Sequence, residues 1–220
     1  MDRKMVIPGE FIVEGDIRLG EGVFKENNKV YSSVMGLIDL KEDYVRVIPI
    51  KGRYTPRVMD FVIGEIVDMD FSCWYADFGA GSTATITARD FFRESDGFQE
   101  DISKAMHTGD TVYAMIREIS PRKRVFLSMR EMGTRKLEGG RIIEVAPAKI
   151  PRIIGRKGSM ISMIKNETGC RVLVGQNGLI WVDGEREKAD FVVSLIERIE
   201  RDAHTSGLTS KIKEIIEKER

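Results

Sequence analysis

The C-terminal part of the chain alternates between strand-like and helix-like spacing of its apolar residues. Beta-branched residues cluster in residues 141–145, and the prolines of residues 147–154 are tolerable only in the first turn of a short helix. Ser159 can cap a second helix, which Gly169 ends, and an Asn177-Gly178 turn separates two further apolar runs. The predicted elements are strand 141–145, helix 147–154, helix 159–169, strands 170–174 and 179–182, and an amphipathic helix containing residues 191–199.

The middle of the chain has strand-like runs separated by turn residues. Gly79-Ala80-Gly81 makes one turn, and Pro121-Arg122-Lys123 makes another. Five strands on this plan fit a small closed barrel. The predicted strands are 60–69, 73–79, 82–86, 111–119 and 124–130.

The two ends of the chain are less informative. Residues 1–59 have β character, with short runs at 10–13, 30–36 and 44–50, and we expect a compact β-barrel or sandwich used for docking. Structural filler remains the alternative for this segment. The tail, residues 206–220, favours a short amphipathic helix that either folds back on the preceding domain or packs on a partner.

Composition limits the class of protein. The chain has 220 residues, of which 42% are hydrophobic and 8% aromatic, so two or three domains are expected. No apolar run approaches the roughly 18 residues of a membrane span, and the N-terminus breaks at Pro8 before a signal-peptide core could form. Cys73 and Cys170 lie far apart and form no CxxC pair. We expect a soluble, cytoplasmic protein without membrane contact, disulfide framework or zinc site.

Charge is distributed unevenly although the net charge is zero. Residues 61–120 hold 4 basic and 11 acidic residues, whereas residues 121–175 hold 13 basic and 4 acidic residues. A positive field concentrated on one segment is what a polyanion binder needs. The acidic segment can instead face a basic protein partner.

The positive segment contains Ile154-Gly155-Arg156-Lys157-Gly158, a GXXG motif with two cations between its glycines. Glycine lacks a Cβ atom, so each glycine lets the main chain approach a ligand closely, and the cations can neutralise phosphates. A GXXG alone is a weak signal, because an ordinary helix-turn-helix connection with solvated cations has the same letters. The elements on both sides add the necessary specificity.

The order strand, helix, GXXG, helix, strand, strand, helix resembles a type I KH domain, βααββα. Gly155 and Gly158 match the glycines of that family's loop, and Ile154 and Ile161 match its apolar flanks. The resemblance implies that the loop clamps the backbone of about four nucleotides of single-stranded RNA. The residues expected to bind RNA here are Arg152, Ile154, Gly155, Arg156, Lys157 and Gly158.

Residues 60–133 resemble an RNA-binding domain of the ribosomal S-one type, which is an OB-fold barrel. Gly64, the Phe78-Gly79 pair and the Gly109-Asp110 pair carry the match. OB-folds bind oligonucleotides with strands two and three and with the loops after strands one and four.

That barrel offers a possible stacking residue and a basic turn. Strand alternation lets only one of Trp74 and Tyr75 point outward, where it can stack a base, and core packing is the alternative. Arg122, Lys123 and Arg124 form the fourth connection, which can contact RNA or be a solvated turn. Many such domains have an apolar residue and a histidine after the Gly-rich turn, where this chain has residues 84–87, Ala-Thr-Ile-Thr. The resemblance therefore does not extend to the third strand.

No pattern in the sequence predicts catalysis. The two histidines, His107 and His204, lack a neighbouring nucleophile or a metal-ligand spacing, and we expect both on the surface. Asp68, Asp70 and Asp77 show no metal-nuclease signature. We expect no cofactor, no metal and no enzymatic activity.

The whole chain resembles the KH-bearing cap subunit of the archaeal RNA exosome. The expected domains are an N-terminal β domain (1–59), an S-one-type barrel (60–133), a KH domain (134–205) and a helical tail (206–220). The resemblance implies a noncatalytic subunit, present in three copies on a ring of RNase PH-like subunits, which captures single-stranded RNA, favours adenine-rich tails and guides the strand inward for 3'-to-5' degradation. A free-standing RNA-binding protein of translation or ribosome assembly is the alternative.

Overall fold

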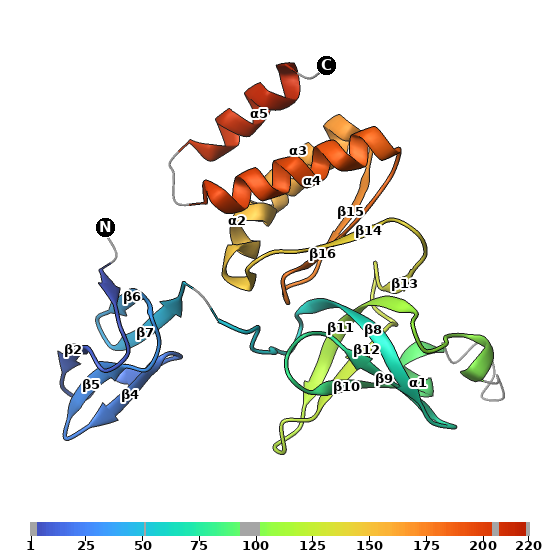
Figure 1. Cartoon of the computed structure of the whole chain (residues 1–220). Coiled ribbons are helices and arrows are strands. Elements are labelled where there is room, and N and C mark those ends of the chain that lie inside the picture. Colours follow the sequence, from blue (N-terminus) through green and yellow to red (C-terminus); the bar gives the residue numbers. More distant parts are fainter. Residues whose placement is uncertain (1–3, 51, 93–101, 204–206, 219–220) are drawn as a thin grey trace. The chain divides into compact units, whose positions relative to one another are not determined.

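The computed structural model describes residues 4–50, 52–92, 102–203 and 207–218, and the chain divides into two compact units, Met1–Gly52 and Arg53–Arg220 (Figure 1). The boundary expected between residues 59 and 60 lies inside the second unit. The reason is that Tyr54 is buried in the core of the barrel that follows it. The second unit contains both the barrel and the KH-like domain.

The N-terminal unit consists of two small sheets, with strand orders β1-β6-β7-β3 and β2-β5-β4. All strand pairs are antiparallel except β3 with β7. Val45 and Val47 of β7 are buried and alternate with more exposed residues, as a strand with one face in the core requires. The strands are β1 (Met5–Val6), β2 (Phe11–Glu14), β3 (Arg18–Leu19), β4 (Val23–Glu26), β5 (Lys29–Ser32), β6 (Gly36–Lys41) and β7 (Tyr44–Pro49).

The second unit begins with the expected five-stranded barrel. The sheet order is β12-β10-β9-β8-β11-β13, and a second pairing between β12 and β11 closes the barrel. A short helix, α1 (Ala88–Phe91), and a 3-10 turn, η2 (Ile102–Lys104), lie between the third and fourth barrel strands. The strands are β8 (Phe61–Met69), β9 (Cys73–Asp77), β10 (Thr83–Thr87), β11 (Thr111–Ile119), β12 (Val125–Ser128) and the additional β13 (Arg135–Leu137).

At three positions in the barrel, the surroundings explain why the chain has that residue type. Trp74 is fully buried, and its indole N–H donates to the Met106 carbonyl at 3.1 Å, which satisfies the one polar atom of the ring. Gly64 lies where β8 crosses close to β9, since a Cβ atom there would be 2.8 Å from the Asp77 carbonyl oxygen. Asp90 is buried and accepts hydrogen bonds from Arg117 and from the Thr87 hydroxyl, so its charge is compensated.

The rest of the second unit has the expected βααββα order. Its sheet is antiparallel throughout, with strand order β14-β16-β15, and α2, α3 and α4 contribute to one apolar core with it. The elements are β14 (Arg141–Glu144), η3 (Pro147–Lys149), α2 (Ile150–Ile154), η4 (Arg156–Gly158), α3 (Ser159–Thr168), β15 (Arg171–Val174), β16 (Leu179–Asp183), α4 (Arg186–Arg201) and α5 (Leu208–Lys218).

Two local features complete this domain. The tail helix α5 buries Leu208, Ile212 and Ile216 in the core shared with α4, so the apolar stripe of the tail is used within the chain. Ser159 does not cap α3 as expected. It is the first residue of the helix, and the cap position is occupied by Gly158 in the left-handed conformation, without a side-chain hydrogen bond.

The barrel and the KH-like domain meet at a fixed contact. Ile63, Leu137 and Trp181 form a buried apolar cluster between them. The Tyr113 hydroxyl donates to the Val174 carbonyl at 3.4 Å, and burial raises the pKa of Tyr113 to about 12. The neutral phenol is therefore kept as a donor throughout the physiological pH range.

Asn177, in the β15–β16 turn, makes the polar part of this contact. Its amide oxygen accepts from the Ile63 N–H at 3.2 Å, and its amide nitrogen donates to the carbonyls of Ile63 at 2.7 Å and Phe78 at 2.9 Å. The side chain is buried, so these bonds are shielded from water. The KH turn is thereby held against the end of β9.

Candidate nucleic-acid interface

The GXXG loop connects α2 to α3 through backbone that favours glycine. Gly155 has φ 75° and Gly158 has φ 78°. A Cβ atom on Gly155 would lie 2.7 Å from the Met160 Cβ and 2.8 Å from the Met160 nitrogen, so a side chain cannot be added without moving α3. Lys157 itself adopts φ 52°, which is uncommon for a residue with a side chain. The sharp turn places the loop backbone at the surface.

The cations in the loop and in α2 just before it are free to meet a ligand. Arg152, Arg156 and Lys157 are exposed, and none of them forms an ion pair or side-chain hydrogen bond with any residue that the structure describes. The flanking Ile154 is half-buried and packs against the core, and Ile161 is buried. The loop thus combines apolar flanking residues that are packed in the core with positive charges that have no ion-pair partner among the described residues, and such charges favour phosphate binding.

The barrel presents Tyr75 outward and Trp74 inward, as strand alternation predicts for one of the two residues. Tyr75 is half-buried on the outer face of β9, opposite Thr85 of β10. On the far side of Thr85, Phe126 of β12 occupies the paired position. The outer face therefore carries two aromatic rings in register with one threonine between them, an arrangement on which bases could stack.

Sequence reasoning missed Phe126. Val125 and Leu127 on either side of it are buried, so the alternation of β12 already places Phe126 on the outer face with Tyr75. The signal was present in the sequence but becomes interpretable only once β10 and β12 are known to pair.

Arg122, Lys123 and Arg124 form an exposed turn between β11 and β12. The turn is ordered by its backbone, since the Ser120 N–H donates to the Arg124 carbonyl at 2.9 Å and Lys123 adopts φ 60°. Ala84 pairs with Val125 in parallel register, so the residues before them, Thr83 and Arg124, lie at the same end of the barrel. The basic turn therefore borders the β9–β10 turn.

Carboxylates also lie beside Tyr75. Asp68 pairs with Tyr75 across the β8–β9 ladder, and Asp70 follows in the turn. A hydrogen bond with Cys73 and the charge of Cys73 raise the pKa of the Tyr75 phenol, with smaller contributions from Asp70 and Asp68. Phosphates are disfavoured beside these carboxylates, so a strand whose base stacks on Tyr75 would direct its backbone toward the basic end.

Replacing Tyr75 with alanine is expected to weaken binding of single-stranded RNA about fivefold, equivalent to about 1 kcal/mol, because a stacked base loses its platform. Tyr75→Phe is the matched control, since it keeps the ring and removes only the hydroxyl, and it should bind as the wild type does. Fluorescence anisotropy with labelled oligonucleotide measures both. Equal affinity of Tyr75→Ala and the wild type would show that no base stacks there.

A further basic residue lies beside the KH sheet. Lys165 of α3 is half-buried, and burial, with the charge of Arg135 as the second cause, lowers its pKa. Sequence reasoning missed this pair because Arg135 and Lys165 come close only in the folded chain. The proximity of Lys165 and Arg135 adds to the positive potential around the KH domain.

His107 is exposed, and its Nδ1 lies 3.9 Å from the Asp110 carboxylate, while His204 lies outside the described residues. Among the described residues, no group of three or more His, Cys, Asp or Glu side chains could hold a metal ion. Cys73 and Cys170 are free thiols. No helix within the described ranges is both long and apolar enough to cross a membrane.

Comparison with known proteins agrees with this arrangement. A family model described as the exosome RNA binding protein RRP4 N-terminal domain matches residues 3–51, and a KH domain model matches residues 140–188. A crystal structure described as that of an exosome complex RNA-binding protein aligns with a TM-score of 0.64 and 30% identity, covering 77% of this chain and 98% of the other. The barrel and KH fold predicted from the sequence is thus confirmed.

Three curated relatives, each named exosome complex component Rrp4, match over nearly the whole chain. The protein of Methanothermus fervidus is 41% identical over 98% of this chain and 96% of its own length. Those of Pyrococcus horikoshii and Methanobrevibacter smithii are also 41% identical, over 98% and 96% of this chain and 83% and 70% of their own lengths. With the fold and the intact GXXG loop, this similarity shows that the chain belongs to the Rrp4 family of exosome components.

Proposed function

We propose that this protein is the noncatalytic RNA-binding subunit of an exosome that degrades RNA from the 3' end. The observation that carries the proposal is the GXXG loop, in which Arg156 and Lys157, with Arg152 of α2 just before them, are exposed and have no ion-pair partner among the described residues. Uncompensated cations around a glycine-lined backbone favour a phosphodiester ligand. Family membership supplies the complex in which such a ligand would be used.

Single-stranded RNA is the ligand that fits both domains. The KH loop would hold the backbone, and the outer face of the barrel would take bases on Tyr75 with the Arg122–Arg124 turn beside them. Stacking tolerates every base, so this face favours capture of varied sequences. A preference for adenine-rich tails rests on the family resemblance alone.

The N-terminal unit supports docking to a protein partner. Seven of the thirteen exposed large apolar side chains of the described residues belong to this unit, and a surface on which such side chains gather favours interaction with a partner. We propose that this unit docks on RNase PH-like ring subunits, with three copies of the chain per ring. The exposed apolar residues are Met5, Ile7, Phe11, Leu19, Phe24, Met35 and Leu40.

We further propose that the chain performs no chemistry. The groups that would meet RNA are guanidinium, ammonium, phenol and backbone, which bind and orient but supply no activated nucleophile or general base here. A free-standing protein of translation or ribosome assembly would use the same surfaces, but no observation favours it over the exosome.

The purified chain should bind labelled single-stranded RNA and leave it intact. Incubation with the RNA and either phosphate or Mg²⁺, followed by denaturing electrophoresis, tests for cleavage, and anisotropy on the same samples measures binding. Shortened RNA that survives further purification of the protein would contradict the noncatalytic assignment. Absence of binding at low salt, where phosphate contacts are strongest, would contradict the RNA-binding assignment.

A further inference from the structure

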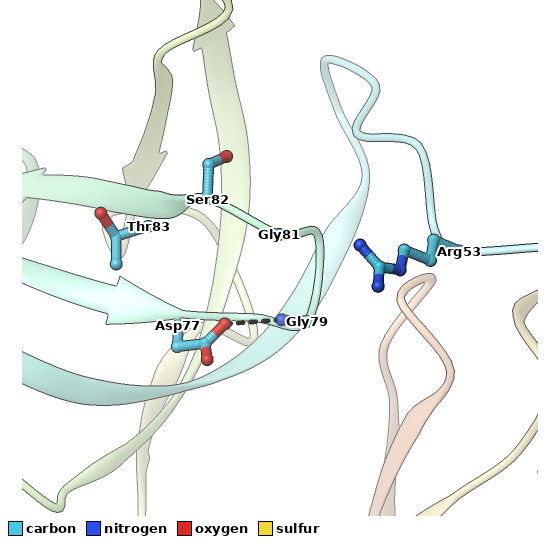
Figure 2. A pocket seen from close by; sticks show the side chains of 6 residues that line it. All are labelled: Arg53, Asp77, Gly79, Gly81, Ser82 and Thr83. Atoms are coloured by element: carbon cyan, nitrogen blue, oxygen red, sulfur yellow. Dashed lines mark hydrogen bonds between the residues drawn. The ribbon is translucent and has the colours of Figure 1, made fainter.

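A polar pocket lies at the end of the barrel, and its lining includes neither the KH loop nor Tyr75. It has a volume of about 490 Å³ and is lined by Arg53, Asp77, Gly79, Gly81, Ser82 and Thr83. Figure 2 shows the Arg53 side chain extending from the segment before β8 toward the β9–β10 turn. Its guanidinium nitrogen lies 3.7 Å from the point where a Cβ atom on Gly81 would stand, so the glycine turn brings backbone close to the cation.

The pocket contains hydrogen-bond donors and one acceptor atom that have no partner among the described residues. Arg53 forms no ion pair or hydrogen bond with any residue in the described part of the chain, and the same holds for the Ser82 and Thr83 hydroxyls. One Asp77 carboxylate oxygen accepts from the Gly79 N–H at 2.9 Å, as drawn in Figure 2, which leaves the other oxygen available. The pocket therefore offers a cation and hydroxyl donors together with one anionic acceptor.

This combination selects among ligands. A bare phosphate would be attracted by Arg53 but repelled by Asp77. A cation would be attracted by Asp77 but repelled by Arg53. A ribonucleotide unit matches both, because its phosphate can accept from Arg53 and Ser82 while its 2'-hydroxyl donates to Asp77. The 2'-hydroxyl is the group by which proteins distinguish RNA from DNA.

The pocket is also continuous with the outer face of the barrel. Asp77 and Thr83 are paired across β9 and β10, and the next pair on that face is Tyr75 with Thr85. Residues two apart on a strand are roughly 6.7 Å apart and lie on the same side of the sheet. A nucleotide held by Arg53 and Asp77 is therefore a direct neighbour of a base on Tyr75.

The KH domain borders this position as well. The Asn177 amide donates to the carbonyl of Phe78, the residue immediately before Gly79. The β9–β10 turn is thus held in place by the KH turn. A rigid turn lowers the entropy lost when a ligand is bound.

We propose that the Arg53–Asp77 pocket binds one ribose-phosphate unit of single-stranded RNA and contributes to discrimination of RNA from DNA. The proposal rests on the RNA-binding function proposed above. Arg53 is the phosphate contact, Ser82 assists it, and Asp77 accepts the hydrogen bond of the 2'-hydroxyl.

The test compares RNA and DNA of one sequence, about 16 nucleotides long, on the full chain by anisotropy over a range of salt. Arg53→Ala should weaken RNA binding about fivefold and reduce the slope of log K against log salt by about 0.7, the value of one phosphate contact on a single strand. Arg89→Ala, an exposed barrel arginine without a partner among the described residues, is the matched control and should change neither.

Asp77→Asn tests the ribose contact. Its amide oxygen can still accept from the Gly79 N–H, so the turn should persist, while the free carboxylate acceptor is lost. The ratio of RNA to DNA affinity should fall about threefold or more, without loss of DNA binding. Circular dichroism and unchanged melting would show that both variants fold.

The outcomes separate the two proposals. If the wild type binds RNA, and Arg53→Ala keeps the wild-type salt slope or Asp77→Asn keeps the wild-type preference for RNA, the pocket proposal is overturned and the general function stands. If the wild type binds neither oligonucleotide at low salt, the proposed function itself fails.

Discussion

Replacing Arg156 and Lys157 together with aspartate is expected to weaken binding of single-stranded RNA by about 30-fold or more. Two charge-assisted phosphate contacts are lost, each worth about 1–1.5 kcal/mol, and two negative charges then repel the strand. The slope of log K against log salt should fall by about 1.4, because about 0.7 is contributed per phosphate on a single strand. Anisotropy across a salt series measures both quantities.

The fold should survive this change. Both side chains are exposed and make no ion pair with a described residue, and the turn is held by the glycines. Lys211→Asp with Lys218→Asp on α5 gives the same change of net charge away from the loop, at two exposed positions. That control separates a local clamp from a general effect of charge. A loop variant with the wild-type salt slope would mean that the loop does not contact phosphate.

Replacing Asn177 with alanine is expected to lower the free energy of unfolding by about 3 kcal/mol. The variant loses three buried hydrogen bonds, and the backbone groups of Ile63 and the carbonyl of Phe78 lose their partner without access to bulk water. The KH turn would no longer be held on β9, so the barrel and KH domain should also unfold less cooperatively. Urea unfolding followed by fluorescence and by circular dichroism would detect this as separated transitions.

Asn166→Ala provides the comparison for that measurement. Asn166 is exposed on α3, and its side chain makes no hydrogen bond or ion pair with another described residue, so its replacement should change stability by less than about 0.5 kcal/mol. If Asn177→Ala unfolds at the same urea concentration as this control, the hydrogen bonds of Asn177 do not hold the two domains together.

Local sequence patterns predict much of this architecture. Alternation predicted the barrel strands and required one of Trp74 and Tyr75 to point inward, and helical spacing predicted α2, α3 and α4 around the GXXG. The roles of Arg152, Arg156 and Lys157 stay predictions, since the structure shows their exposure and not their ligand.

Other features depend on contacts between distant segments. Asn177 and Ile63 are 114 residues apart in the chain, and a turn asparagine looks alike whether it meets water or another domain. The sequence alone does not assign Arg53 to a pocket, because the pocket forms only when the β9–β10 turn is folded beside it. The tail was ambiguous for the same reason. An amphipathic helix shows which of its residues are apolar but not which surface they pack on. Here that surface is the KH core. The cap expected at Ser159 failed because a left-handed glycine could make the same turn.

RNA degradation by a ring of RNase PH-like subunits, assembled with and without this chain, tests the proposed function most directly. The chain should co-elute with the ring, be inert by itself, and accelerate phosphorolysis of adenine-rich single-stranded RNA at concentrations too low for the ring to bind alone. The Arg156→Asp, Lys157→Asp variant should still assemble but lose most of the acceleration. Failure of the wild-type chain to associate with the ring, or association without any change in the rate, would contradict its role as the RNA-capturing subunit.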